Sequence, residues 1–311
     1  MTPFDSARLR RRLFWTAVLM LVALGGAGLA SAADRPATDD LRPELYARAD
    51  LRGAPWLAGM LAQLHAVDDG VSDLAHAARD VLASLQRLDP GQLTALLAGG
   101  DTAASDLEVA VMQLGGMRDD PPAGLDQARL SMLNRELLGG VDRALAATLP
   151  LDTTWRELSG TARDLATLVD SLFRHESLVF AATSAAREVR WTAALDLLDE
   201  GRTALALASG VRDRLAEPNR DGTIDDLLDR YAAYSDALTE LYTELRDGAA
   251  LDSPSVTNLL AAVDTAQQAL PDDTDALRVA VSELGGATLA EAVLALERAR
   301  GVMAQVVGAL P

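Results

Sequence analysis

Residues 224–246 read IDDLLDRYAAYSDALTELYTELR, and their apolar side chains recur with the spacing of a coiled coil. Two interleaved sets repeat every seven positions, namely Ile224, Tyr231, Leu238 and Leu245, and between them Leu227, Tyr234 and Leu241. In a helix, this spacing places all of them in one stripe. We therefore predict a helix over residues 224–246 whose apolar stripe is covered by a partner helix.

The remainder of the chain indicates the same secondary structure. Its apolar residues recur at spacings of three and four, without a sustained alternation of the kind that marks strands. Capping boxes, in which a hydroxyl and a carboxylate satisfy N–H groups of the first turn, predict helix starts at Ser105, Thr154 and Thr288. The chain is therefore expected to be all-α, as one or more multi-helix up-and-down bundles with short connecting loops.

Glycine pairs that follow apolar runs predict where these helices end, because glycine readily closes a last turn. The pairs are Gly99-Gly100, Gly115-Gly116, Gly139-Gly140 and Gly285-Gly286. The predicted helices span residues 41–49, 55–66, 71–88, 90–98, 103–114, 123–149 (with a break allowed at the third pair), 153–174, 177–216, 224–246, 254–269, 273–284 and 288–308.

The N-terminal residues 1–33 have the composition of an export signal. Four arginines among residues 8–12 precede an apolar run over residues 13–29 that ends in small residues. Because about 20 apolar residues can span a bilayer, an uncleaved membrane anchor over residues 13–32 is the alternative to a cleaved signal. We expect an exported protein that is periplasmic, extracellular or held at the outer face of the plasma membrane.

Charge and composition exclude several functions. The formal net charge is −18, which repels the phosphates of nucleic acids, so no nucleic-acid partner is expected. The chain has no lysine, which excludes Walker phosphate loops, pyridoxal Schiff bases, S-x-x-K acyl transfer and protein kinases. It also has no cysteine, so its stability must come from burial rather than from disulfides.

The stretch Asp119-Asp120-Pro121-Pro122 is the predicted domain boundary, because two prolines after two acids stop a helix. It separates a short-helix region, residues 34–120, from a long-helix bundle, residues 121–311.

A short loop before the opening stretch resembles the calcium-binding loops of EF-hand and dockerin proteins. With Gly222 at the invariant glycine, the candidate ligands are Glu217, Asn219, Asp221, Thr223 and Asp225. The ends of the loop depart from that pattern. Glu217 stands where Asp is expected, and Leu228 replaces the bidentate carboxylate. The resemblance implies a weak calcium site, and the alternative is a capped turn between two helices. No other cofactor is expected.

Five other side chains could hold zinc or another divalent cation if they shared one helix face: His65, Asp69, Asp73, His76 and Asp80. Residues 68–70, Asp-Asp-Gly, predict a turn that would divide this face, which leaves a solvated polar surface as the alternative. His175-Glu176 begins the zinc-hydrolase motif H-E-x-x-H, but Val179 replaces its second histidine.

Aromatic residues gather in the long helices: Trp155, Trp191, Tyr231, Tyr234 and Tyr242. They could surround a small apolar ligand between helices, or fill the bundle interior with their polar tips in water.

No combination of residues specifies a catalytic site, so the chain is not expected to be an enzyme. The main hypothesis is a non-catalytic exported protein that binds a partner protein, self-associates or forms part of the cell envelope. The alternative is a periplasmic or extracellular module that binds a ligand or, weakly, calcium.

Overall fold

The computed structural model describes residues 43–215, 222–271 and 274–310, and this part of the chain is helical without strands. The all-α prediction is confirmed. Residues 1–33 lie outside the described part. In order, the elements are α2 (Pro43–Gln86), α3 (Pro90–Asp119), the 3₁₀ helix η1 (Gln127–Arg129), α4 (Met132–Thr148), α5 (Leu151–Arg187), α6 (Trp191–Leu215), α7 (Thr223–Arg246), α8 (Pro254–Ala269) and α9 (Asp275–Gly308).

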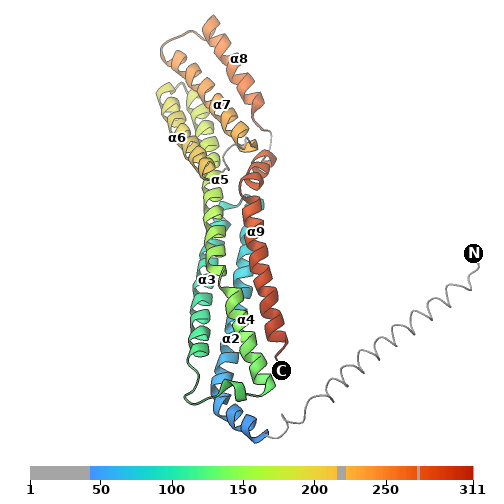
Figure 1. Ribbon diagram of the computed structural model, residues 1–311. Coiled ribbons are helices and arrows are strands. Elements are labelled where there is room, and N and C mark those ends of the chain that lie inside the picture. Colours follow the sequence, from blue (N-terminus) through green and yellow to red (C-terminus); the bar gives the residue numbers. More distant parts are fainter. Residues whose placement is uncertain (1–42, 216–221, 272–273, 311) are drawn as a thin grey trace, which may run out of the picture.

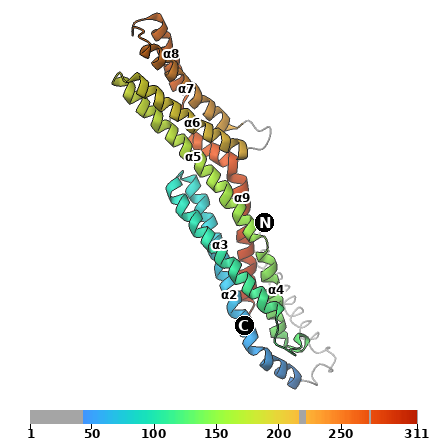
Figure 2. The same ribbon diagram turned by 90° about the vertical axis from the view of Figure 1, so that its left-hand side faces the viewer.

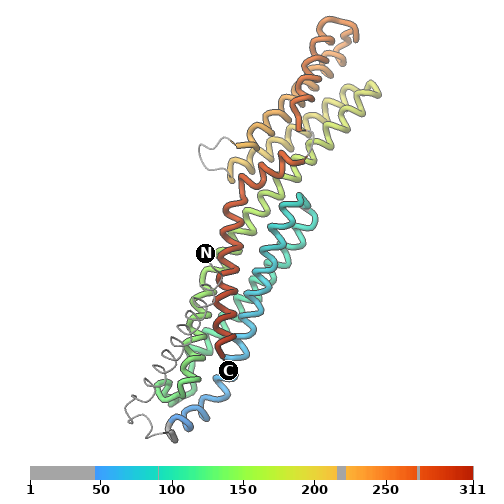
Figure 3. Tube along the Cα trace, turned by 90° about the vertical axis from the view of Figure 1, so that its right-hand side faces the viewer, coloured from blue at the N-terminus to red at the C-terminus, as the bar shows by residue number. Residues whose placement is uncertain are grey.

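The helices run along one long axis and form a rod (Figure 1). One end, which we call the base, contains α2, α3, α4, the first half of α5 and most of α9. The other end, the arm, contains the second half of α5 together with α6, α7 and α8 (Figure 2). The last turn of α9 returns to the base beside α2 and α4 (Figure 3).

Several predicted helix ends are wrong, because the glycine pairs lie inside continuous helices. The three helices predicted between residues 41 and 88 are a single helix, α2. The turn expected at residues 68–70 lies inside it and is helical. The helices on either side of Gly99-Gly100 form α3, and those on either side of Gly285-Gly286 form α9. The break allowed at Gly139-Gly140 does not occur, since α4 is continuous there.

Close contact between helices explains two of these glycines, Gly100 and Gly285. A Cβ atom on Gly100 would lie 2.1 Å from the ring of Trp155 in α5. A Cβ atom on Gly285 would lie 2.5 Å from the side chain of Leu165, also in α5. These glycines therefore make room for a neighbouring side chain instead of ending a helix.

Two real helix ends use residues other than glycine. Leu88 after α2 and Val189 after α5 adopt the left-handed conformation, with φ of 54° and 59°. The following amides close the turns, since Asp89 N–H donates to the carbonyl of Ser84 and Arg190 N–H to that of Ala185. The second of these turns follows Arg187, the last residue of α5. Helix α5 therefore extends past the predicted junction at residues 174–177.

The apolar stripe of α7 is covered from within the chain. Ile224, Leu227 and Tyr231 are buried together with residues of the base, which form the large core. Leu238 and Leu241 belong to a separate small core of the arm, formed by Val179, Ala182, Ala185, Ala186, Ala194, Leu198, Leu238, Leu241, Tyr242 and Val256. Helix α6 supplies much of the cover, so the partner helix that the stripe requires is intramolecular.

The predicted boundary at residues 120–121 falls in the connection between α3 and η1. Buried residues on its two sides, such as Leu114 and Leu130, belong to the same large core. The division into two domains stays a prediction.

Within the described residues, α9 is the helix with the length and composition of a membrane span, with a mean hydropathy of 1.5 in its most apolar window. Leu289, Leu296 and Met303 of this helix are buried in the large core.

Candidate functional site

A polar layer separates the two cores at the junction of base and arm. It consists of His175 on α5, Gly201 on α6 and Ser235 on α7, and His175 is only 1% exposed. Nδ1 of His175 lies 3.1 Å from the carbonyl oxygen of Gly201, and Nε2 lies 3.3 Å from Oγ of Ser235. Because a carbonyl only accepts, Nδ1 carries the proton, and Nε2 accepts a hydrogen bond from the Ser235 hydroxyl.

Desolvation makes this imidazole hard to protonate. Burial lowers the pKa of His175, although the Gly201 hydrogen bond and the charge of Glu176 act in the opposite direction. The Ser235 hydroxyl is itself fully buried. The pair therefore links α5 to α7 inside the molecule.

Beside this layer, Tyr231 and Glu176 form the wall of a pocket of about 330 Å³. The Tyr231 hydroxyl donates to the Glu176 carboxylate, and its ring meets that of His175 edge-on at 5.4 Å. Burial and then the hydrogen bond to Glu176 raise the pKa of Tyr231. Tyr234 and Phe180, the latter 74% exposed, complete an aromatic lining that could hold a small apolar ligand.

The aromatic set that the sequence singled out is thus divided among three places. Tyr231 and Tyr234 line the pocket. Tyr242 packs against Trp191 in the arm, with ring centroids 5.9 Å apart. Trp155 fills the space above Gly100, and its Nε1 donates to Asp101 at 2.8 Å.

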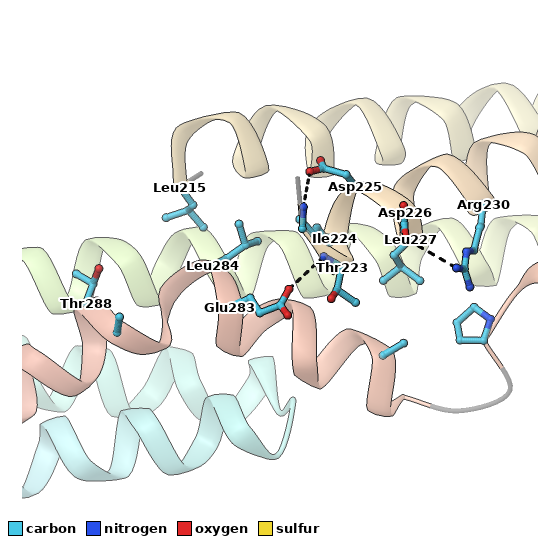
Figure 4. Close-up of a pocket in the computed structure, with 14 residues that line it drawn as sticks. Leu215, Thr223, Ile224, Asp225, Asp226, Leu227, Arg230, Glu283, Leu284 and Thr288 are labelled. Carbon is cyan, nitrogen blue, oxygen red and sulfur yellow. Dashed lines mark hydrogen bonds and ion pairs between the residues drawn. The ribbon is translucent and has the colours of Figure 1, made fainter. Parts of the chain in front are cut away.

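A second pocket, of about 570 Å³, lies between α7 and α9 and includes two candidate calcium ligands, Thr223 and Asp225 (Figure 4). Asp225 accepts a hydrogen bond from the Gly222 N–H at 3.2 Å and forms an ion pair with Arg212. The Thr223 N–H donates to Glu283 at 3.1 Å. In this arrangement Asp225 caps α7, and calcium would have to compete with Arg212 for its carboxylate.

The other three candidate calcium ligands, Glu217, Asn219 and Asp221, lie outside the described residues. The calcium site therefore stays a prediction.

Because α2 is continuous, the five candidate ligands from His65 to Asp80 belong to one helix. Nδ1 of His76 lies 2.7 Å from the Ser72 carbonyl oxygen and must donate to it. Among the described residues, no group of three or more His, Asp or Glu side chains is placed to hold a metal ion.

An apolar groove of about 660 Å³ lies at the base between α2 and α4. The α2 wall includes Ala47, Leu51, Ala54, Ala58 and Leu61, and Leu133, Leu137 and Leu310 line the other side. Leu51 is 76% exposed and Leu133 is 50% exposed. This groove was not predicted from the sequence, although the spacings of four, three, four and three along α2 are those of a coiled-coil stripe.

A charged group joins the two helices that form the groove. Asp50 of α2 accepts hydrogen bonds from the Ser131 N–H at 3.0 Å and the Asn134 amide at 2.7 Å. Burial alone would raise the pKa of Asp50, but these hydrogen bonds lower it overall. The ionised carboxylate thus fixes the distance between α2 and α4.

No protein family, curated protein or solved structure matches the chain.

Proposed function

We propose that this chain is an exported, non-catalytic protein that binds another protein at the cell envelope. Residues 1–33 would act as its signal or its anchor, and its helices would form an up-and-down bundle. The observation that carries the proposal is the exposed apolar groove between α2 and α4. Large exposed apolar patches with polar surroundings are typical of protein-binding surfaces.

The groove is lined by residues of two helices, α2 and α4, together with Leu310. A stripe of small and large apolar residues on α2 faces the same space as Leu133 and Leu137, which are one turn apart on α4. An amphipathic helix can place its apolar face in such a space. Burying an exposed leucine contributes roughly 1.5–3 kcal/mol, so covering Leu51 and Leu133 supplies a driving force for association.

Site-specific photo-crosslinking in exporting cells tests this role. We expect a photoreactive residue at position 133 to form a covalent protein adduct, because Leu133 lines the groove. A photoreactive residue at Leu251, which is 72% exposed and far from the groove on the arm, is the matched control. Absence of adducts at position 133, or equal yields at both positions, would contradict the proposal.

A second candidate function is ligand binding at the aromatic pocket of Phe180, Tyr231 and Tyr234. A ligand that binds only the folded state raises the melting temperature. We expect small apolar compounds to raise the melting temperature of residues 34–311. The Tyr234→Ala variant should not show this rise.

Calcium is tested with the same protein after metal removal. Millimolar calcium should raise the melting temperature, and Asp221→Ala should abolish the rise. An unchanged melting temperature would favour a capped turn.

A further inference from the structure

We propose that the aromatic pocket beside the polar layer binds a small organic amine, with the protonated amine at Glu176 and the apolar body of the ligand against the aromatic side chains. This inference rests on the second candidate function, ligand binding at that pocket, and names the class of ligand. It does not depend on the groove between α2 and α4, whose lining residues are different.

Three parts of the chain enclose this pocket. One face of α5 contributes Glu176 and Phe180, and α7 contributes Tyr231 and Tyr234. The third side comes from the end of α8 and the residues that follow it, namely Gln267, Leu270 and Pro271. The volume of about 330 Å³ is within the range of small-molecule sites, roughly 300–1,000 Å³. A ligand in this space would lie between α5 and the end of α8.

A series of contacts holds the Glu176 carboxylate at the pocket wall. The Tyr231 hydroxyl donates to Oε1 of Glu176, and the ring of Tyr231 meets the ring of His175 edge-on. His175 is in turn fixed between the Gly201 carbonyl and the Ser235 hydroxyl. A carboxylate on an exposed helix face would otherwise exchange among several rotamers. The negative charge is therefore positioned before a ligand arrives, which lowers the entropic cost of binding.

The charge of Glu176 is open to a ligand. Within the described part of the chain, no arginine forms an ion pair with it, and the hydrogen bond from Tyr231 reaches only one of its two oxygens. An ionised carboxylate can accept hydrogen bonds at both oxygens. A protonated amine would donate a charge-assisted hydrogen bond to Oε2, and such bonds are about twice as strong as neutral ones.

The aromatic lining also favours a cation. The faces of aromatic rings carry negative potential and attract a cation within about 6 Å of the ring centroid. Phe180, Tyr231 and Tyr234 all line the pocket, and the exposed ring of Phe180 can be buried by the apolar body of a ligand. A ligand with a carboxylate would be repelled by Glu176. The amine is therefore the ligand class that suits both the charged and the aromatic groups.

Arg187 limits the ligand to a single positive charge. It follows Glu176 by eleven residues on α5, which places their Cα atoms about 16 Å apart along the helix. This separation exceeds the Debye length of about 8 Å at physiological ionic strength, so Arg187 opposes an amine at Glu176 only weakly. A second ammonium group at the far end of the ligand would face Arg187, which also lines the pocket.

Calorimetric titration of the full chain with tryptamine and tryptophol tests the ligand class. The two probes share an indole body, but tryptamine has a protonated amine where tryptophol has a hydroxyl group. We expect tryptamine to bind about tenfold more tightly than tryptophol. Glu176→Gln should remove this preference, because the amide oxygen can still accept from Tyr231 but carries no charge. Glu157→Gln, which removes an exposed carboxylate elsewhere on α5, is the matched control and should keep the preference.

Tyr231→Phe tests whether Tyr231 acts as a positioning residue. Without its hydroxyl, the Glu176 carboxylate loses the hydrogen bond that holds it at the pocket wall. We expect the affinity for tryptamine to fall roughly three- to tenfold, with the affinity for tryptophol unchanged. A merely structural role of Tyr231 would lower the affinity for both probes alike.

The outcomes separate this inference from the function on which it rests. Equal affinities of the wild type for the two probes would overturn the amine class and leave ligand binding at the pocket standing. Tryptamine binding that Glu176→Gln leaves unchanged would lie elsewhere on the acidic surface and would overturn the inference. Failure of both probes to bind would overturn the inference and the second candidate function together.

Discussion

The base and the arm share helix α5, but different side chains fill their cores. The large core of the base contains closely packed leucines, among them Leu64, Leu158, Leu165 and Leu168, which are fully buried. In the small core of the arm the helices meet through alanines, and Leu198 is its one leucine of comparable burial. Since stabilisation scales with buried apolar area, the base should be the more stable part.

Helix α8 illustrates this difference. It packs mainly on α7, and Val256 is its buried residue. An element with few buried apolar contacts opens at a lower free energy than the whole molecule. We therefore expect the arm to open locally while the base remains folded.

The largest effect should come from an identical truncation in each core. Leu168→Ala, in the large core, should lower the global free energy of unfolding by about 2–5 kcal/mol, because it leaves a cavity among leucines. Leu198→Ala should cost about 2 kcal/mol, since its neighbours are small. Denaturant titration gives the magnitudes, and hydrogen exchange shows where protection falls.

The region in which hydrogen exchange becomes faster shows whether the base and the arm unfold separately. Leu168→Ala should speed exchange in both regions, whereas Leu198→Ala should speed it in the arm alone. If both variants unfold the whole molecule to the same extent, then base and arm form one cooperative unit.

A smaller effect is expected from the adjacent glycines of α3. Gly100→Ala would push a Cβ atom into Trp155 and should destabilise the base by about 1–3 kcal/mol. Gly99→Ala is the matched control, because nothing lies within 4 Å of its Cβ position. It should stabilise the protein by about 0.5–1 kcal/mol through helix propensity. Thermal unfolding of both variants measures the difference, and equal shifts would show that Trp155 yields at no cost.

These glycines also explain how far the fold could be predicted. Helical periodicity indicated the all-α class and the buried stripe of α7, because both depend on local spacing. Helix ends were mispredicted because glycine can close a turn or admit a neighbouring helix, and local sequence does not distinguish the two. The real ends at Leu88 and Val189 carry no glycine signal at all.

The candidate sites also contain features that local spacing indicates and features that only the packing of helices creates. The spacing of Ala47, Leu51 and Ala54 was present in the sequence, but only the position of α4 makes it a groove. The polar layer could not be predicted, because His175 and Ser235 are 60 residues apart and meet only through the packing of α5 against α7.

The smallest effect should come from acid at the layer between base and arm. His175 is neutral in the folded protein and its pKa is lowered by burial, whereas in the unfolded chain its pKa is about 6.5. The unfolded state therefore binds the proton more readily, and stability is lost as pH falls below about 6.5 towards the folded pKa. One group can contribute at most about 1.4 kcal/mol per pH unit.

Substitution separates this contribution from that of the carboxylates. His175→Gln should flatten the loss of stability between pH 7 and 5, because it removes the buried group whose pKa is lowered on folding. Protonation would reverse the hydrogen bond, so that Nε2–H donates to the Ser235 hydroxyl, whose own proton would lose its acceptor. Because it would also charge a site between the two cores, faster hydrogen exchange should begin in the arm. Equal pH slopes in the wild type and His175→Gln would show that the imidazole takes up its proton without disturbing the junction.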